Sequence, residues 1–156
     1  MRNAMQRLLV SLLLPYVTRW IETQERRILA EGTALDARGI DDARRIGVAH
    51  PERVRLLCVP TVPVPGGALV AAFDRWSGMP GGETMGLTAR YGIFIRAELF
   101  GDRHLLAHEL AHIAQYERLG GVRPFLQQYL TECLTTGYAS AALEQEAAAA
   151  AATVAS

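Results

Sequence analysis

The chain has 156 residues with 16 acidic and 16 basic side chains, so its formal net charge is zero. Half of the residues are apolar, enough for the core of one compact domain. The balanced charge gives no electrostatic basis for nucleic acid as the main partner, and Cys58 and Cys133 lack the spacing of a disulfide-rich secreted scaffold. We therefore predict a single cytoplasmic domain over residues 1–156.

The N-terminal segment is predicted to form one amphipathic helix over residues 3–31, ending at Gly32. Its most apolar part, residues 8–17, is too short to span a bilayer, and no small-residue cleavage site follows it. We interpret this helix as part of the core or of an interface. Contact with a membrane surface and export as a signal peptide are the alternatives.

The middle of the chain alternates short elements with loops rich in glycine and proline. The loops at 60–67 and 78–85 are expected to shape or cover a cleft. The predicted elements, in chain order, are a helical turn at 41–45, a strand at 54–59, a short helix at 68–76, and strands at 86–90 and 93–96 joined by Tyr91-Gly92.

The last part of the chain is predicted to be helical throughout. One helix covers 103–119, with Asp102 as its N-cap, and a second covers 122–136. A final helix begins near Ser140 and runs into an alanine-rich tail, whose end (148–156) is expected to fray because it has little to bury. Helices, a few strands and then helices predict an α+β fold, mostly helical, with a sheet of two or three strands.

The segment that carries chemistry is His108-Glu109-Leu110-Ala111-His112, an HExxH motif inside the predicted helix 103–119. Residues four apart lie on one face of a helix, so both imidazoles can reach one zinc ion. Glu109 lies beside them without being a ligand and can accept a proton from a metal-activated water. The motif therefore predicts a catalytic zinc site, with one ion per chain.

A zinc hydrolase needs a third protein ligand and an open fourth position. No histidine follows His112 at the metzincin spacing, because positions 115 and 118 are Gln and Arg. The residues alone leave a carboxylate or a thiolate as the third ligand, and the downstream candidates are Glu117, Glu132, Cys133, Glu144 and Glu146.

An HExxH helix, a helical hairpin and a glutamate on a later helix resemble the gluzincin group of zinc metallopeptidases, in a minimal, minigluzincin-like form. The resemblance covers about residues 86–147, and it implies a zincin-like active-site helix followed by a helix that carries the third ligand. In that group the ligand commonly begins an ExxA-type pattern. This implies Glu144 as ligand, with Glu146 as runner-up. Ala148 departs from the Asp or Asn of many relatives and leaves the residue that supports the histidines unassigned.

The resemblance also bears on the substrate. In such enzymes the strand before the motif helix is often the sheet edge and pairs with an extended peptide, which implies this role for residues 91–96. Tyr138 is a candidate donor to the developing oxyanion, and His104, one turn before His108, is a candidate for orienting the substrate. An ordinary packed tyrosine and a solvated histidine are the alternatives.

The function predicted from these residues is a zinc-dependent metallopeptidase that acts on a peptide or protein, with Glu109 as general base. The alternative is a non-catalytic zinc-binding scaffold that retains the HExxH helix. A structural zinc site normally has four protein ligands and no use for a base, so the retained Glu109 favours hydrolysis. A deformylase-like hydrolase would need a cysteine ligand in a glycine-rich context, which Cys58 lacks.

Overall fold

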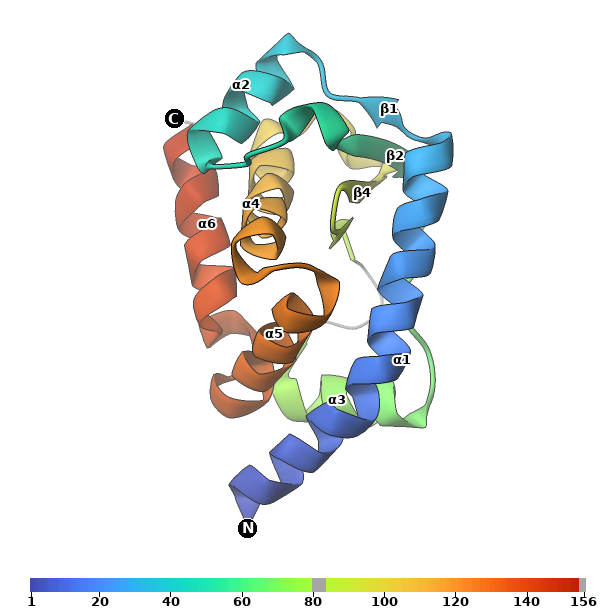
Figure 1. Cartoon of the computed structure of the whole chain (residues 1–156), viewed down its shortest axis with the longest axis vertical. Coiled ribbons are helices and arrows are strands. Elements are labelled where there is room, and N and C mark those ends of the chain that lie inside the picture. The colour runs from blue at the N-terminus through green and yellow to red at the C-terminus, as the bar shows by residue number, and fades with distance from the viewer. Residues whose placement is uncertain (80–83, 155–156) are drawn as a thin grey trace.

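The computed structural model of the chain describes residues 1–79 and 84–154. It has the predicted α+β fold, mostly helical with a small mixed sheet (Figure 1). The helices are α1 (Arg2–Glu31), α2 (Ala37–Ile46), α3 (Ala68–Ser77), α4 (Arg103–Leu119), α5 (Val122–Thr136) and α6 (Ala142–Val154). The strands are β1 (Thr33–Ala34), β2 (Arg55–Val59), β3 (Gly86–Ala89) and β4 (Gly92–Arg96), and short 3-10 turns cover Pro51–Arg53, Ala97–Leu99 and Tyr138–Ser140.

The sheet has the strand order β1-β2-β4-β3, with β2 and β4 parallel and the other pairs antiparallel. It has one strand more than the predicted two or three, because the two-residue β1 adds to β2. The prediction that residues 91–96 form the sheet edge is wrong, since β4 pairs with β2 on one side and β3 on the other. Ile93, Phe94 and Ile95 are all buried, as is typical of a central strand. On this side of the sheet, the free edge belongs to β3.

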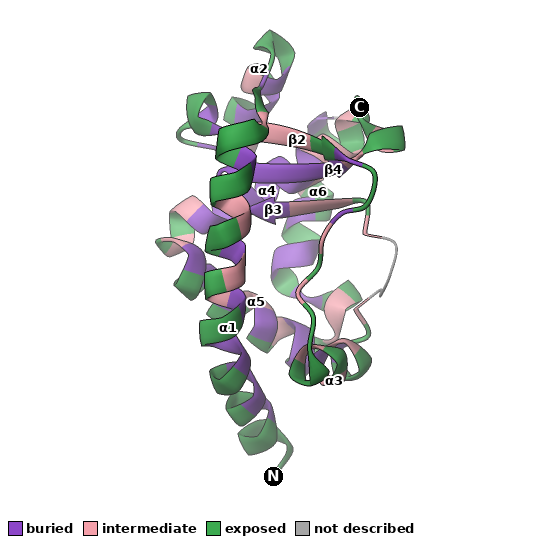
Figure 2. Ribbon diagram, turned by 90° about the vertical axis from the view of Figure 1, so that its right-hand side faces the viewer, coloured by how far each residue is buried: buried purple, intermediate pink, exposed green. Residues whose placement is uncertain are grey.

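Helices cover both faces of this sheet. Figure 2 shows α1 running across β2, β4 and β3, with β4 buried except at its last residue, Arg96. Side chains of β4 alternate between the faces: Phe94 packs with the α1 cluster, whereas Ile93 and Ile95 pack with Leu110 and Ile113 of α4. The sheet thus holds α4, the motif helix, against a rigid layer.

The β3–β4 hairpin turns at Arg90-Tyr91, one residue earlier than predicted, and Arg90 has a φ of 55°. This shift places Gly92 in β4, directly beneath α1. A Cβ atom at Gly92 would lie 2.8 Å from the Cβ of Ile28, a fully buried residue. Only glycine therefore permits the observed approach of α1 to the sheet.

Of the predictions for the two ends of the chain, the one for the N-terminal helix is confirmed and the one for the C-terminal tail is mostly wrong. The predicted helix over residues 3–31 is confirmed by α1, and no helix in the described part of the chain has both the length and the apolar character needed to cross a bilayer. The prediction of a frayed tail is wrong for 148–154, which continue α6; residues 155–156 lie outside the described residues. Ala151 is buried against Ala107 of α4, because small side chains let the two helices lie close together.

Candidate metal centre

The motif helix α4 begins and ends as the sequence predicts. The Asp102 carboxylate accepts a hydrogen bond from Leu105 N at 2.9 Å, and Gly120 ends the helix with a φ of 100°. Leu110 and Ile113 are buried under the sheet, which turns His108 and His112 toward α5 and α6. Both imidazoles thus lie on one side of a helix whose other side is fixed by the core.

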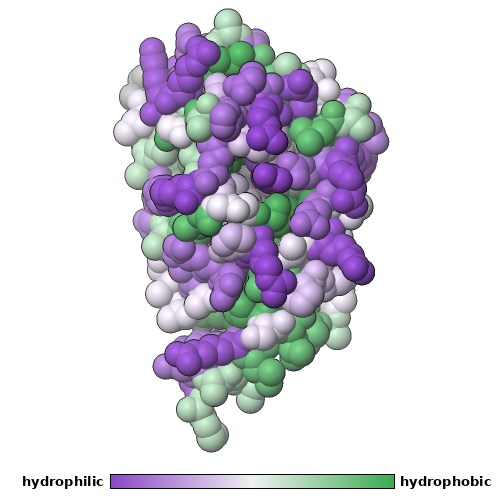
Figure 3. All heavy atoms as spheres, in the orientation of Figure 1, coloured by the Kyte–Doolittle hydropathy of each residue, from purple (hydrophilic) through white to green (hydrophobic). Residues whose placement is uncertain are grey.

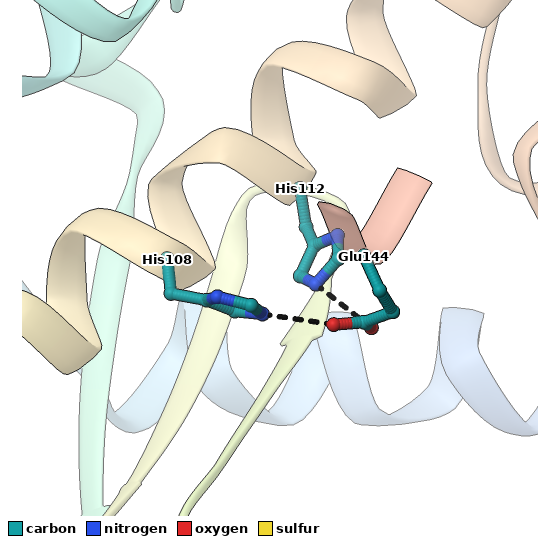
Figure 4. Close-up of side chains that lie close together, drawn as sticks. All are labelled: His108, His112 and Glu144. Carbon is teal, nitrogen blue, oxygen red and sulfur yellow. Dashed lines mark hydrogen bonds and ion pairs between the residues drawn. The ribbon is translucent and has the colours of Figure 1, made fainter. Parts of the chain in front are cut away.

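The third member of the site comes from α6, which lies beside α4 (Figure 1). Glu144, in the first turn of α6, is buried and faces both histidines (Figure 4). Its Oε2 lies 3.0 Å from His108 Nε2, and its Oε1 lies 3.3 Å from His112 Nε2. The ligand atoms of the three residues all lie within 4.8 Å of one another.

These distances fit a metal site. Three ligands placed 2.0–2.1 Å from one tetrahedral ion are about 3.3 Å apart, and the two separations between a histidine and a Glu144 oxygen, 3.0 and 3.3 Å, are close to this value. Two imidazole nitrogens and a carboxylate oxygen are also a donor set that zinc binds. His108, which is partly buried, and the buried His112 and Glu144 therefore form a group that could hold a metal ion. This group includes Glu144, the third ligand expected from the sequence.

The acidic and basic side chains of the site stabilise one another's charged forms. Burial disfavours ionised Glu144, but hydrogen bonds from His108 and His112 outweigh it and hold the pKa of this carboxyl well below its usual range. Burial likewise disfavours the charged form of His112, but Glu144 and Glu109 raise its pKa overall. A negative centre next to two imidazoles is thus built into the fold and is suited to a cation.

Glu109 lies next to this group, and residues of β3 hold its carboxylate in place. The carboxylate is buried, and Thr88 Oγ1 lies 2.6 Å from its Oε2, so the hydroxyl of β3 can donate to it. The other oxygen packs against Gly86, where a Cβ atom would lie 3.0 Å from Oε1. The hydrogen bond from Thr88 and the close packing against Gly86 thus hold the Glu109 carboxylate beside the ligands. Its Oε1 atom accepts no hydrogen bond from the described residues.

Gln115 supplies the support that the sequence left unassigned at Ala148. It is fully buried, and its Nε2 donates to the Leu143 carbonyl at 2.9 Å. Its Oε1 then accepts from His112 Nδ1 at 2.8 Å. A proton on Nδ1 leaves the Nε2 atom of a neutral imidazole as the ligand. Gln115 therefore both orients His112 and anchors the residue before Glu144.

Tyr129 is a site residue that the sequence reasoning missed. Its hydroxyl donates to Glu144 Oε1 at 2.6 Å, and its ring meets that of His112 edge-on, with centroids 6.0 Å apart. Phe125, one turn earlier on α5, stacks on both Tyr129 and Tyr116. The aromatic pair at 125 and 129, spaced like the two histidines, was the available sequence signal.

The other candidate ligands are engaged elsewhere. Glu146, the runner-up, forms an exposed ion pair with Arg118 at 2.7 and 3.0 Å, so it is not part of the group. Glu117 accepts hydrogen bonds from the backbone at residues 49 and 50, and Glu132 accepts one from the Leu143 N–H. Cys133 is fully buried, and its pKa is raised to about 12, chiefly by burial.

The group of His108, His112 and Glu144, which we call the metal group because it could hold an ion, opens into a cavity of about 510 Å³. Glu109, Tyr138 and His104 line it too, and burial followed by the nearby charge of Glu144 raises the pKa of Tyr138. Away from the metal group, the walls from α1, α3 and α5 are mainly apolar and include Leu13, Val17, Phe73, Leu126 and Leu130. Both predicted cleft loops contribute, through Val64, Pro65, Met79, Thr84 and Met85; residues 80–83 lie outside the described residues.

Comparison of the chain with protein-family models, curated proteins and solved structures found no match. The resemblance to gluzincins thus rests on the HExxH motif and on the position of the later glutamate. Support for a function comes from the geometry of the site residues themselves.

Proposed function

We propose that this protein is a zinc-dependent metallopeptidase, with His108, His112 and Glu144 as ligands and Glu109 as general base. The observation that carries the proposal is the convergence of these three ligand atoms at one end of a cavity that also contains a separately held carboxylate. Bound zinc would supply a Lewis acid that makes water nucleophilic near neutral pH. Two histidines and a glutamate with an open fourth position are a ligand set of catalytic zinc sites.

The protein's own groups have distinct parts in this mechanism. The Thr88 hydroxyl holds Glu109 Oε2, so Oε1 is the atom that accepts the proton from the attacking water. Glu109 then returns the proton to the leaving amine. Tyr138, whose raised pKa keeps its hydroxyl protonated, donates a hydrogen bond to the developing oxyanion of the substrate carbonyl.

A peptide substrate would pair with β3 instead of the strand first expected. β3 lies at the sheet edge next to the motif helix, and both Gly86 and Thr88 contact Glu109. An extended peptide hydrogen-bonded to this edge would bring its carbonyl groups past the base. The apolar cavity walls then offer space for a neighbouring aliphatic or aromatic side chain.

The number of ligands separates this proposal from a non-catalytic zinc scaffold. A structural zinc site is normally closed by four protein ligands, whereas the group found among residues 1–79 and 84–154 has three. The unused carboxylate of Glu109, held beside the group by Thr88, has no role in a scaffold. Both features favour an open, catalytic site.

The test begins with metal analysis of the purified chain without a tag. We expect about one zinc per chain by elemental mass spectrometry, lost in Glu144→Ala and retained in the matched control Glu146→Ala. Zinc loss in the control alone would reverse the ligand assignment. No zinc in the wild type after incubation with the metal would remove the whole proposal.

The second step separates metal binding from hydrolysis. Zinc-loaded wild type is expected to cleave members of a peptide library, and Glu109→Gln is expected to keep its zinc but lose at least about 10²-fold in turnover. Equal turnover in the two metal-replete proteins would refute the role of Glu109. Zinc binding with no cleavage by the wild type would favour the scaffold.

A further inference from the structure

The first half of α1 is apolar on its buried side and along part of its exposed side. Its inner side is buried in the core and includes Leu9, Leu13 and Val17. Its outer side carries a row of large apolar side chains, each about half exposed or more, which we call the outer stripe: Met1, Met5, Leu8, Leu12 and Tyr16. Spacings of three and four residues place them along one line of the helix. A surface of this kind indicates an interaction site.

The outer stripe lies at one end of the molecule. Figure 3 shows hydrophobic residues gathered at the lower end, where the first half of α1 lies in the same orientation. The stripe extends over residues 1–16, about 24 Å at the rise of an α-helix. It is long enough to lie along a flat surface.

The charges around the stripe have a single sign. Arg2, Arg7 and Arg19 are exposed, and none of their side chains forms an ion pair within the described residues. Residues 1–21 contain no Asp or Glu; the first carboxylate is that of Glu22. The surface is therefore apolar and locally cationic, although the whole chain has no net charge.

We propose that the outer stripe docks onto an anionic lipid bilayer, with the first half of α1 lying in the plane of the interface. The apolar side chains would enter the boundary between headgroups and acyl chains, and Arg2 and Arg19, the arginines nearest the line of the stripe, would contact acidic headgroups. This mode of binding needs no membrane span, in keeping with the absence of a spanning helix from the described residues. The proposal does not rest on the proposed peptidase activity.

The same charges disfavour a second copy of the chain as the occupant. A two-fold contact places the same patch of both copies face to face. The arginines of one copy would then meet those of the other, with no carboxylate in residues 1–21 of either chain to pair with them. An anionic surface provides the opposite charge throughout.

Docking would also set the position of the cavity. Leu13 and Val17, on the inner side of the same half of α1, line the cavity that holds the metal group. A chain bound through the outer stripe would therefore hold this cavity one helix away from the lipid surface. Segments of proteins that emerge from a membrane would be within reach.

The experiment is flotation of the full chain with vesicles of two compositions. One contains phosphatidylcholine with about 30% phosphatidylglycerol, and the other contains phosphatidylcholine alone. We expect the wild type to float with the anionic vesicles at low salt and to be released at about 0.5 M NaCl. The double variant Leu8→Gln/Leu12→Gln is expected to bind at least about tenfold more weakly, while Leu29→Gln, an exposed leucine of α1 outside the stripe, binds as the wild type does.

Three results would overturn the proposal. The first is an absence of wild-type flotation with anionic vesicles at low salt, and the second is equal flotation of the double variant. The third is a dimer of the wild type that the double variant abolishes, with no lipid binding, which would assign the stripe to self-association. Because both leucines are exposed, thermal unfolding of the double variant should match the wild type and show that it folds.

Discussion

Replacing Gln115 by methionine is expected to weaken both the fold and the metal site. The two side chains have similar volume and flexibility, so the change removes hydrogen bonds while largely conserving packing. The variant loses the 2.8 Å bond to His112 Nδ1 and the 2.9 Å bond to the Leu143 carbonyl. Both bonds are buried, because Gln115 is fully inaccessible to solvent.

The size of the effect depends on these two partners. Each buried polar group left without a hydrogen bond costs about 1–3 kcal/mol, so the loss of both bonds should lower the free energy of unfolding by about 2–6 kcal/mol. Zinc affinity should fall about 10–100-fold, because His112 loses the acceptor that fixes its proton on Nδ1. The residue before Glu144 loses its anchor at the same time, so two of the three ligands are affected.

The assay measures the two effects separately. Urea unfolding with a chelator present gives the stability of the metal-free chain, and competition with a chromophoric chelator gives zinc affinity. Gln127→Met is the matched control, since Gln127 is exposed on α5 and its side chain forms no hydrogen bond within the described residues. Reduced stability with unchanged zinc affinity would refute the orienting role of Gln115 and leave it a purely structural residue.

Three further changes test other parts of the structure. Gly86→Ala places a Cβ atom 3.0 Å from Glu109 Oε1, so turnover of a peptide substrate should fall at least about tenfold while zinc affinity stays within about twofold; loss of zinc instead would contradict this role of Gly86. Tyr129→Phe removes the 2.6 Å hydrogen bond to the ligand carboxylate and should lower zinc affinity up to about tenfold in the same competition assay; an unchanged affinity would show that the hydroxyl does not support the ligand. Asp42→Asn removes the charge and one of the two acceptors of a pair with Arg103, whose bonds are both 2.8 Å long, and should lower the stability measured by urea unfolding near pH 7. The hydrogen bond from Arg103 holds the pKa of Asp42 below its usual value, so the pair stabilises the fold above the unfolded pKa of about 4. This stability is lost as pH falls through the lower folded pKa, and a wild-type advantage that does not shrink in acid would contradict the assignment.

The sequence was most informative where the geometry is local. His108 and His112 face the same way because four residues make about one helical turn, and Asp102 and Gly120 mark the ends of that helix by their capping chemistry. These features depend on neighbours within one or two turns. They could therefore be predicted without knowledge of the rest of the chain.

The choice between Glu144 and Glu146 required more than local geometry. Two residues apart on a helix, their side chains point in nearly opposite directions, so only one can face α4. The face that α6 presents is set by Ala147 and Ala151, which are buried together with Glu144. Residues 148–156 were predicted to fray, because the sequence near them does not show what these alanines pack against. Ala151 packs against Ala107 of α4, more than thirty residues earlier in the chain.

The sequence by itself determined the fold class, the motif helix and the residue types that could bind a metal, since periodicity and capping act over short distances. The tertiary structure decided which strand is the sheet edge: β2 pairs in parallel with β4 across the intervening α3 and β3, and this covers the strand first expected to bind substrate. It also brought Thr88 of β3 to Glu109 and Tyr129 of α5 to Glu144. Contacts between residues distant in sequence depend on how whole elements pack, and no local pattern records that packing.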